Sequence, residues 1–312
     1  MLFLGCGWAT ALHSRTLRRL HDVDLYFASR DKGRAGSFRD RFRGQRAYSS
    51  YEEGLADPAV DVALVATPTS THRELALLAL SAGKHVIVEK PAFMHSDDVN
   101  AVRGAAAGAG RRVFVAENYY YKPIAEHLRR TIGAGHLGDV RFVALNATKR
   151  QRAEGWRADP ALSGGGALFE GGVHWISFAS NIGLDVQEVH AWRAGAADGP
   201  DRSSLVVLRY ANSAVGTLAH SWEIDAPFGG LRLSKVQGTA GSVTFESNGF
   251  AHVTTGRRRS VGFLALSDPL GYRAMLTDFL GDVRGGRAAR FTLEMAERDL
   301  VLLEQAARSM AG

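Results

Sequence analysis

Short apolar runs alternate with helix-like stretches through the first 116 residues of the chain. The apolar runs are expected to be strands, and they span residues 2–4, 24–28, 62–66, 85–88 and 113–116. Between two of them, residues 71–82 place apolar side chains three and four positions apart, as on one face of a helix that Gly83 ends. Such alternation is typical of βαβ units, in which crossover helices join parallel strands. The first half therefore predicts a doubly wound α/β domain.

The pattern changes after Asn118. Strand-like runs follow one another at 141–148, 186–192, 204–210, 214–222, 231–238 and 242–245, separated by short breaks that contain Gly and Asn. Consecutive strands with little helix between them favour an antiparallel sheet. Two helices, 272–283 and 293–311, close the chain, and the apolar stripe of the second indicates core packing. We expect a parallel-sheet domain at 1–118 and an α+β domain at 119–312 with an open-faced, mostly antiparallel sheet.

Charge and composition exclude several classes of partner. The formal net charge is +6, but 38 Lys and Arg are interleaved with 32 Asp and Glu, and the basic runs at 39–46 and 257–259 are short and lack aromatic residues. We therefore expect no nucleic-acid partner. No apolar stretch approaches the roughly 18 residues that span a bilayer, and no signal peptide is recognisable, so we expect no membrane partner and a cytoplasmic location. Cys6 is the single cysteine, which excludes an intrachain disulfide.

A glycine-rich loop follows the first strand, with the sequence Gly5-Cys6-Gly7-Trp8-Ala9-Thr10. Two glycines at this spacing let the backbone turn tightly and approach a pyrophosphate, which then lies at the N-terminus of the next helix. Thr10 departs from the fingerprint, which has Gly or Ala at this third position for close packing. A plain glycine turn would share these letters, but the order strand, glycines, helix and strand favours a dinucleotide site formed by Gly5, Gly7, Trp8, Ala9 and Thr10.

The second strand ends in Ala28-Ser29-Arg30. In NAD-binding domains a carboxylate at this place accepts from the ribose 2′-hydroxyl, whereas a hydroxyl and a guanidinium suit the 2′-phosphate of NADP. Ser29 and Arg30 therefore favour NADP over NAD. Two alternatives stay open: Asp31 could reach the ribose after a shift of register, which would allow NAD, and Arg30 could be an ordinary surface residue.

Two further turns follow strands of the parallel sheet. Thr67, Pro68 and His72 lie in the turn after 62–66, where they could contact a cofactor or simply cap the next helix. The strand 85–88 leads into Glu89-Lys90-Pro91, so Lys90 lies at the carboxyl edge of the sheet, where open α/β sheets bind ligands. A lysine beside an oxidised, cationic nicotinamide should release its proton more readily and exchange it with a substrate oxygen.

The second domain contains Gly164-Gly165-Gly166 followed by Glu170 and His174. On a helix the four-residue spacing places the carboxylate and the imidazole on one face, where Glu170 could orient the ring or raise its basicity. An isolated pair of this kind is more often structural than catalytic. Since no convincing third ligand accompanies the pair, we expect no metal site.

Five elements together resemble the glucose-fructose oxidoreductase, inositol dehydrogenase and MocA (Gfo/Idh/MocA) family. They match the family in order and separation over nearly the whole chain: the glycine loop, Glu89-Lys90-Pro91, Glu117-Asn118-Tyr119 with Pro123, Trp156-Arg157, and Gly164-Gly165-Gly166 leading to Gly172-Val173-His174. The resemblance implies a Rossmann domain joined to an open-faced sheet domain. It also implies hydride transfer between the nicotinamide C4 and the carbinol carbon of a sugar, cyclitol or related polyol.

The resemblance also assigns roles to single residues. It implies that Lys90 bonds the reacting oxygen and the cofactor and that His174 is the general acid or base. Glu170 is the third expected catalytic residue. It stands where the family usually has Asp, so its role is the least secure of the three. The expected cofactor contacts are completed by Glu89 and Asn118. For the substrate we expect Tyr119, Tyr121, Trp156, Arg157 and His174, although each tyrosine could equally be a core residue and Arg157 could form a surface ion pair.

Several functions remain open at this point. The leading hypothesis is an NADP-preferring dehydrogenase or ketoreductase, with a substrate that could be phosphorylated or nucleotide-linked. The same fold could reduce a C=N or conjugated double bond, or cleave glycosides with a retained cofactor. A non-catalytic dinucleotide-binding regulator is a third reading, but such a protein needs neither Lys90 nor His174. The broad second sheet predicts a homodimer or homotetramer that packs sheet to sheet.

Overall fold

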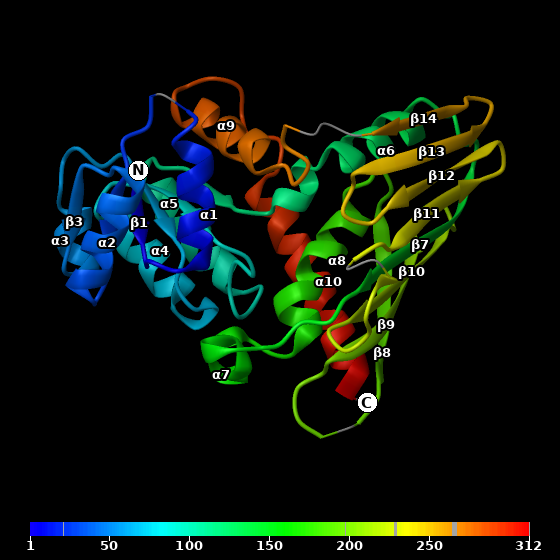
Figure 1. Cartoon of the computed structure of the whole chain (residues 1–312), viewed down its shortest axis with the longest axis horizontal. Coiled ribbons are helices and arrows are strands. Elements are labelled where there is room, and N and C mark those ends of the chain that lie inside the picture. Colours follow the sequence, from blue (N-terminus) through cyan, green and yellow to red (C-terminus); the bar gives the residue numbers. More distant parts are fainter. Residues whose placement is uncertain (21, 197, 228–229, 264–266, 312) are drawn as a thin grey trace. The chain divides into compact units, whose positions relative to one another are not determined.

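We describe a computed structural model of the chain for residues 1–20, 22–196, 198–227, 230–263 and 267–311 (Figure 1). The chain divides into two compact units. The N-terminal unit comprises Met1–Ala116 and Tyr272–Glu297, and the C-terminal unit comprises Glu117–Gly271 and Arg298–Gly312. The sequence boundary at residue 118 assigned 272–297 to the second domain. In the structure this segment belongs to the first unit, because Phe279 stacks on Phe114 with ring centroids 4.7 Å apart.

A six-stranded parallel sheet forms the centre of the N-terminal unit, in the order β3-β2-β1-β4-β5-β6. Its strands are β1 (Leu2–Leu4), β2 (Tyr26–Ala28), β3 (Arg46–Tyr48), β4 (Val62–Val65), β5 (His85–Val88) and β6 (Val113–Val115). The expected doubly wound sheet is confirmed. Strand β3 was not expected, because only its last residue is buried and it carries no apolar run. The strand order reverses between β1 and β4, which places the ligand crevice of such a sheet at their carboxyl ends.

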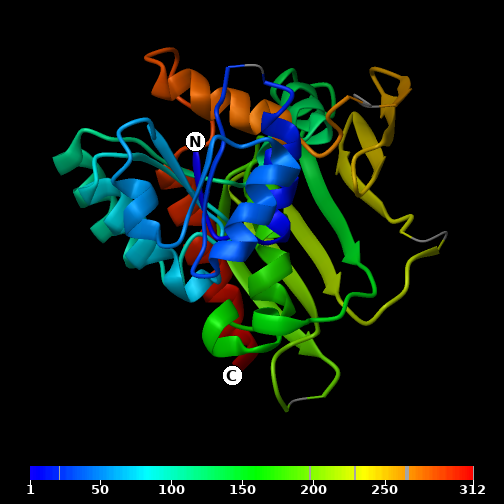
Figure 2. The same cartoon turned by 60° about the vertical axis from the view of Figure 1, so that its left-hand side comes forward.

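Helices cover both faces of this sheet, as right-handed crossovers require. Figure 2 shows α1 (Trp8–Leu17) and α2 (Lys32–Phe42) on one face, and α4 (His72–Ser81) and α5 (Asp98–Ala109) on the other. The unit also contains α3 (Tyr51–Leu55), the 3-10 turn η1 (Thr69–Thr71) and α9 (Tyr272–Val283). The predicted helix at 71–82 is confirmed as α4, which buries Leu75 and Ala79 and is followed by Gly83 at φ 70°.

An eight-stranded sheet forms the C-terminal unit, in the order β14-β13-β12-β11-β7-β10-β9-β8. Its strands are β7 (Val140–Thr148), β8 (Val186–Ala194), β9 (Ser203–Tyr210), β10 (Val215–Ser221), β11 (Leu233–Gly238), β12 (Gly241–Glu246), β13 (Ala251–Gly256) and β14 (Ser260–Phe263). Neighbouring strands are antiparallel except β7 and β10, which are parallel. The expected mostly antiparallel sheet is confirmed. The β13–β14 hairpin was not expected from the basic run at 257–259.

Three helices cover one face of the large sheet: α6 (Pro123–Gly133), α8 (Val173–Ser180) and α10 (Leu293–Ala311). Phe178 of α8 contacts Phe245 of β12, with centroids 6.0 Å apart, and Ser309 of α10 accepts from the backbone N–H of Ala191 at 2.8 Å. The unit also contains the 3-10 turns η2 (Asn118–Tyr121) and η3 (Gly155–Ala158), helix α7 (Pro160–Ser163) and the π-helix η4 (Leu168–Gly172).

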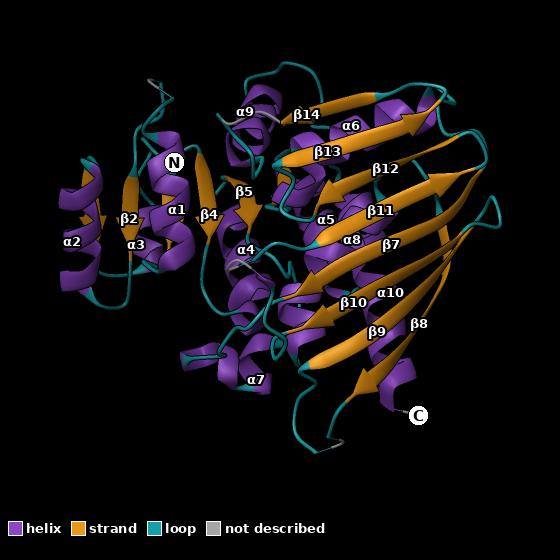
Figure 3. Cartoon of the chain, turned by 45° about the vertical axis from the view of Figure 1, so that its right-hand side comes forward, coloured by secondary structure: helices purple, strands orange, loops and turns teal. Residues whose placement is uncertain are grey.

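No helix of the described chain covers the opposite face of this sheet, which faces the viewer in Figure 3. We call it the outer sheet face. Its strands expose several large apolar side chains: Phe142, Trp192, Leu205, Val215, Leu233, Val253, Val261 and Phe263. Some of them are direct neighbours across the strands, because Trp192 pairs with Leu205 and Phe142 pairs with Val215. Such a patch on a sheet face is typical of a protein–protein contact.

Candidate active site

The loop between β1 and α1 has the shape of a phosphate-binding turn. Gly5 has φ 97°, and a Cβ at this position would lie 2.7 Å from the carbonyl oxygen of Ala66, so no side chain fits. A Cβ on Gly7 would meet open space, and Gly7 is the N-cap of α1 without any side-chain cap. The first N–H groups of α1 have no partner within the helix. The loop therefore fits a pyrophosphate at the N-terminus of α1.

Thr10 supports this loop from within. Its side chain is buried, and its hydroxyl donates to the carbonyl oxygen of Gly5 at 2.7 Å. This bond explains how the chain tolerates a β-branched residue where the fingerprint has Gly or Ala. Trp8 is 67% exposed at the start of α1, and Ala9 follows it in the same turn. Both expected cofactor residues therefore lie at the helix terminus that the phosphate would approach.

The end of β2 presents arginines rather than a free carboxylate. The Asp31 carboxylate caps α2 by accepting from the backbone N–H of Arg34 at 3.1 Å. The Ser29 hydroxyl accepts from the backbone N–H of Asp31 at 3.2 Å. Arg30 is exposed and interacts with the hydroxyl of Tyr51, where burial raises the pKa of the phenol and the guanidinium opposes that rise. Asp31 is thus engaged at the helix terminus, while Arg30 is accessible.

His72 ties two of the expected cofactor turns together. Its Nε2 lies 3.0 Å from the carbonyl oxygen of Thr67, and its Nδ1 lies 3.0 Å from that of Pro91. The ring is buried, and this burial lowers its pKa, while the carbonyl oxygens that it contacts oppose that shift. The Thr71 hydroxyl lies 2.7 Å from the hydroxyl of Thr67 and also donates to Pro68. His72 and Thr71 therefore fix the shapes of the turns that follow β4 and β5.

Glu89 and Lys90 follow β5, and the carboxylate of Glu89 is held on two sides. It contacts Nε2 of His13, a buried residue of α1, and it accepts from the backbone N–H of Lys90 at 3.1 Å. Burial works to raise the pKa of Glu89, but the hydrogen bond and charge of His13 together with Lys90 hold it below the usual range. The sequence analysis missed His13, whose only signal was a histidine within the helix that follows the glycine loop.

In the C-terminal unit, His174 is paired with Glu117. The ring Nδ1 lies 2.8 Å from Oε1 of Glu117 and 3.0 Å from Oε2, and both side chains are largely buried. Glu117 lies two residues after the end of β6 and is the N-cap of η2, and His174 is the second residue of α8. Because the carboxylate accepts at Nδ1, it selects the tautomer in which Nε2 is unprotonated. The pair has the geometry of a general base and its orienting group.

Glu170, which the sequence predicts to act on His174, has an arginine partner in the structure. Glu170 is buried and accepts from Nε of Arg157 at 2.8 Å. Residues 168–172 form a π-helix rather than an α-helix, and the catalytic role of Glu170 stays a prediction. Glu117 is the carboxylate that meets Nδ1 of His174. Although it belongs to a matching family element, it was not among the predicted site residues.

The remaining expected residues of this unit fall into two groups. Tyr119 stacks on His174 with ring centroids 4.4 Å apart and 12° between the planes, whereas Tyr121 is buried. Asn118 is also buried and donates to the carbonyl oxygen of Leu270 at 2.7 Å. Trp156 and Arg157 form their own group, with the guanidinium 4.6 Å from the indole centroid. Arg157 is thus engaged by Glu170 and Trp156, which limits its freedom as a substrate anchor.

Among the residues that the structure describes, no group of three or more His, Cys, Asp and Glu side chains is arranged to bind a metal ion. No helix in the same ranges combines the length and apolar character that crossing a membrane requires.

Comparison with known proteins places this arrangement in one family. Residues 1–117 match the family model described as an oxidoreductase family with an NAD-binding Rossmann fold, and residues 125–244 match the Gfo/Idh/MocA C-terminal domain. A human trans-1,2-dihydrobenzene-1,2-diol dehydrogenase is 30% identical over 233 residues, which cover 73% of this chain and 68% of the human protein. The chain belongs to the Gfo/Idh/MocA oxidoreductase family. It is an oxidoreductase with an NAD-binding Rossmann domain.

Other family members extend the comparison. The bovine enzyme of the same name is 31% identical, over 66% of this chain and 62% of the bovine protein. A levoglucosan dehydrogenase solved with NADH has a TM-score of 0.86 at 21% identity, over 99% of this chain and 96% of that one. A Bordetella pertussis dehydrogenase solved with NADH and UDP-GlcNAcA has a TM-score of 0.84 at 20% identity, over 99% and 94%. At 21% and 20% identity, these two solved structures show that the fold is shared and no more.

Proposed function

We propose that this family member is an NADP-preferring dehydrogenase that transfers a hydride between the nicotinamide C4 and a carbinol carbon of a sugar, cyclitol, diol or related polyol. The Glu117–His174 pair carries the proposal, because oxidation of a hydroxyl requires a base for its proton. The names of relatives agree with this class: they include dehydrogenases of a dihydrodiol and of levoglucosan.

His174, Glu117 and Lys90 each have a separate role in the proposed reaction. The bound cofactor supplies the hydride acceptor. His174 takes the hydroxyl proton at Nε2, because its Nδ1 faces Glu117. The Glu117 carboxylate then stabilises the imidazolium that forms, as the orienting acid of a catalytic triad does. Lys90 bonds the reacting oxygen, and in the reverse direction His174 returns the proton to the carbonyl oxygen.

The activity test uses the whole chain with each reduced and oxidised nucleotide and a panel of sugars, cyclitols and diols. We expect turnover with at least one hydroxyl compound and a loss of about 10²-fold or more in kcat/KM for Lys90→Ala and His174→Gln. Arg209→Ala, an exposed change on β9, is the control and should keep full activity. Failure of both nucleotides to bind would refute the proposal at its first step.

The preference for NADP rests on the end of β2. Asp31 is engaged at the N-terminus of α2, while Ser29 and Arg30 offer a hydroxyl and a guanidinium. Charge-assisted bonds to a 2′-phosphate are stronger than neutral ones, so NADP gains more than NAD from Arg30. The relatives solved with NADH leave this preference to be tested in this chain.

Titration of nicotinamide fluorescence with NADPH and with NADH separates the two cofactors. For Arg30→Ala we expect an NADPH dissociation constant about 10- to 100-fold higher and an unchanged NADH constant. Arg39→Ala, which removes an exposed arginine of α2 that pairs with Asp40, is the matched control. Equal weakening of both nucleotides by Arg30→Ala would argue against a 2′-phosphate contact.

We also propose that the chain forms a homo-oligomer through the outer sheet face. The proposal rests on the exposed apolar pairs of that face, of which Trp192 is 52% and Leu205 is 43% exposed. A second copy offers the same apolar surface, so a two-fold contact buries both patches at once.

A further inference from the structure

Lys122 is a lysine that the proposed reaction does not use. It links η2 to α6, and its side chain is 0% exposed. Among the residues that the structure describes, none offers a hydrogen-bond partner to its Nζ. A buried ammonium without a hydrogen bond is costly, so the contacts that replace water around it are informative.

Aromatic rings surround the Lys122 ammonium. Nζ lies 3.6 Å from the ring centroid of Tyr119 and 5.7 Å from that of Trp175. Both distances are within the range of cation–π attraction, which is strongest when the cation is desolvated. The Tyr119 ring is therefore held by Lys122 from one side, and the edge-to-face contact with Trp175, at 5.4 Å between centroids, supports it further.

His174 occupies the other face of the Tyr119 ring. The imidazole is nearly parallel to that ring, with centroids 4.4 Å apart, and Nζ of Lys122 lies 3.6 Å from the same tyrosine centroid. Two groups this close to one ring centre would overlap if they shared a face, so they lie on opposite faces. The C-terminal unit thus contains a four-membered stack in the order Lys122, Tyr119, His174 and Glu117.

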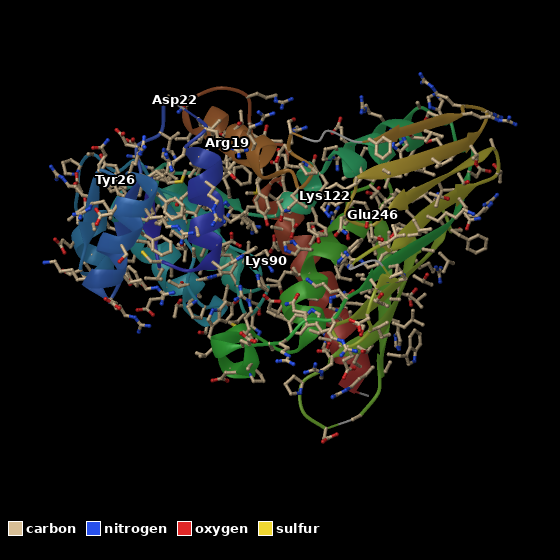
Figure 4. All side chains as sticks on the ribbon, viewed as in Figure 1. Arg19, Asp22, Tyr26, Lys90, Lys122 and Glu246 are labelled. Atoms are coloured by element: carbon tan, nitrogen blue, oxygen red, sulfur yellow. The ribbon has the colours of Figure 1, made fainter. Side chains whose placement is uncertain are left out.

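Charges around Lys122 come from several elements. Glu246 of β12 and Glu117 favour the ammonium, whereas Arg232 and Lys149 oppose it, and burial outweighs all of them to lower the lysine pKa to about 7. Figure 4 labels Lys122 and Glu246 in the C-terminal unit. Burial raises the pKa of Tyr119 to about 12, so the ring between the ammonium and the imidazole stays neutral. Lys122 therefore changes charge close to neutral pH.

We propose that Lys122 is a positioning residue for His174, acting through the Tyr119 ring that its ammonium holds against the imidazole. The proposal rests on the dehydrogenase function proposed above, in which His174 is the base. The ammonium fixes the plane of the stack, and its charge opposes the protonation of His174. Both effects keep the imidazole neutral and oriented toward Glu117.

The first test follows the titration of His174 by NMR of the histidine ring carbons, in the whole protein without substrate. The His174 signal is assigned by its loss in His174→Gln. Lys122→Met keeps the length of the side chain and removes the charge, and we expect it to move the His174 midpoint up by about half a unit to one unit of pH. Lys122→Arg restores the charge and should return the midpoint toward the wild-type value.

A second set of variants guards against misfolding. If Lys122→Met does not fold, Lys122→Gln is also neutral and has the same expected shift. Tyr119→Leu interrupts the stack and should reduce kcat while changing KM for the nucleotide little, whereas Tyr119→Phe keeps the ring and should leave the His174 midpoint at its wild-type value. A folded, neutral Lys122 variant with an unchanged His174 midpoint would overturn the proposal.

The same data separate this inference from the proposed function. If the His174 midpoint shifts in Lys122→Met but no hydroxyl compound is oxidised, the coupling of Lys122 to His174 stands and the dehydrogenase proposal fails. If the enzyme oxidises a polyol and the midpoint does not move, the function stands and Lys122 is only a core residue.

Discussion

Glu117 is the carboxylate that selects the tautomer of the His174 ring. Because its oxygens lie 2.8 and 3.0 Å from Nδ1, they favour the proton on that nitrogen and stabilise the imidazolium. We expect Glu117→Gln to lower kcat/KM for hydroxyl oxidation by about 10²-fold and to move the acid limb of the pH–rate profile to lower pH. The physical reason is that the amide keeps the shape but loses the charge.

Glu170→Gln is the matched control for Glu117→Gln. Glu170 is also a buried glutamate, but the contact described for it goes to Arg157. We expect this variant to move the acid limb less than Glu117→Gln does and to change chiefly KM for the substrate. Equal shifts of the limb in the two variants would mean that Glu170 also acts on His174.

At the scale of an element, the β1–α1 loop offers two glycines with different physical roles. Gly5→Ala should lower the thermal stability, because the side chain meets Ala66 O at 2.7 Å and the left-handed backbone costs an alanine about 1 kcal/mol or more. Gly7→Ala should fold normally and weaken NADPH binding about tenfold, because its methyl enters the open space that the phosphate would use. Thermal melts measure the effect of Gly5→Ala on stability, and nucleotide titrations measure the effect of Gly7→Ala on binding.

Helix α10 contains a buried carboxyl that makes stability depend on pH. Burial raises the pKa of Asp299 from 3.8 to about 6, against the opposing Arg298 and Ser177. The folded state therefore binds the proton more tightly than the unfolded chain, so this group lowers the unfolding free energy as pH rises from about 4 to about 6.

Asp299→Asn removes that pH-dependent cost. We expect the variant to be about 1 kcal/mol more stable at pH 7, with the gain lost near pH 4, because the amide can keep a bond to Asn181. Asp139→Asn, at an exposed turn, is the control and should show no pH-dependent difference. Thermal unfolding between pH 4 and 8 measures both, and a gain that persists at pH 4 would have another origin.

At the scale of the whole molecule, the outer sheet face decides the expected assembly. Trp192→Glu places a charge in the centre of an exposed apolar pair, and we expect it to convert the oligomer to a monomer in light scattering at micromolar concentration. Leu162→Glu, an exposed change on α7, is the control. A wild-type monomer under the same conditions would count against the sheet-to-sheet contact. The cytoplasmic location expected from the sequence stays a prediction.

Periodic patterns made much of the fold predictable. The parallel strands were visible as short apolar runs, and α4, α9, α10 and most strands of the second sheet were visible because buried faces repeat every two or 3.6 residues. The Gly5 loop and the end of β2 were equally local, since a glycine turn and the residues after a strand are defined by neighbours in sequence. Short or polar elements such as β3 and the β13–β14 hairpin gave no such signal.

The sequence by itself determined the two fold classes, the glycine loop and the place of Lys90 and His174 in the family pattern. Only the tertiary structure decided that Glu117 meets His174, because the two residues are 57 positions apart, and that Glu170 accepts from Arg157. It also placed His13 against Glu89 and Lys122 against Tyr119. These contacts depend on how helices and turns pack, and local spacing carries no information about that packing.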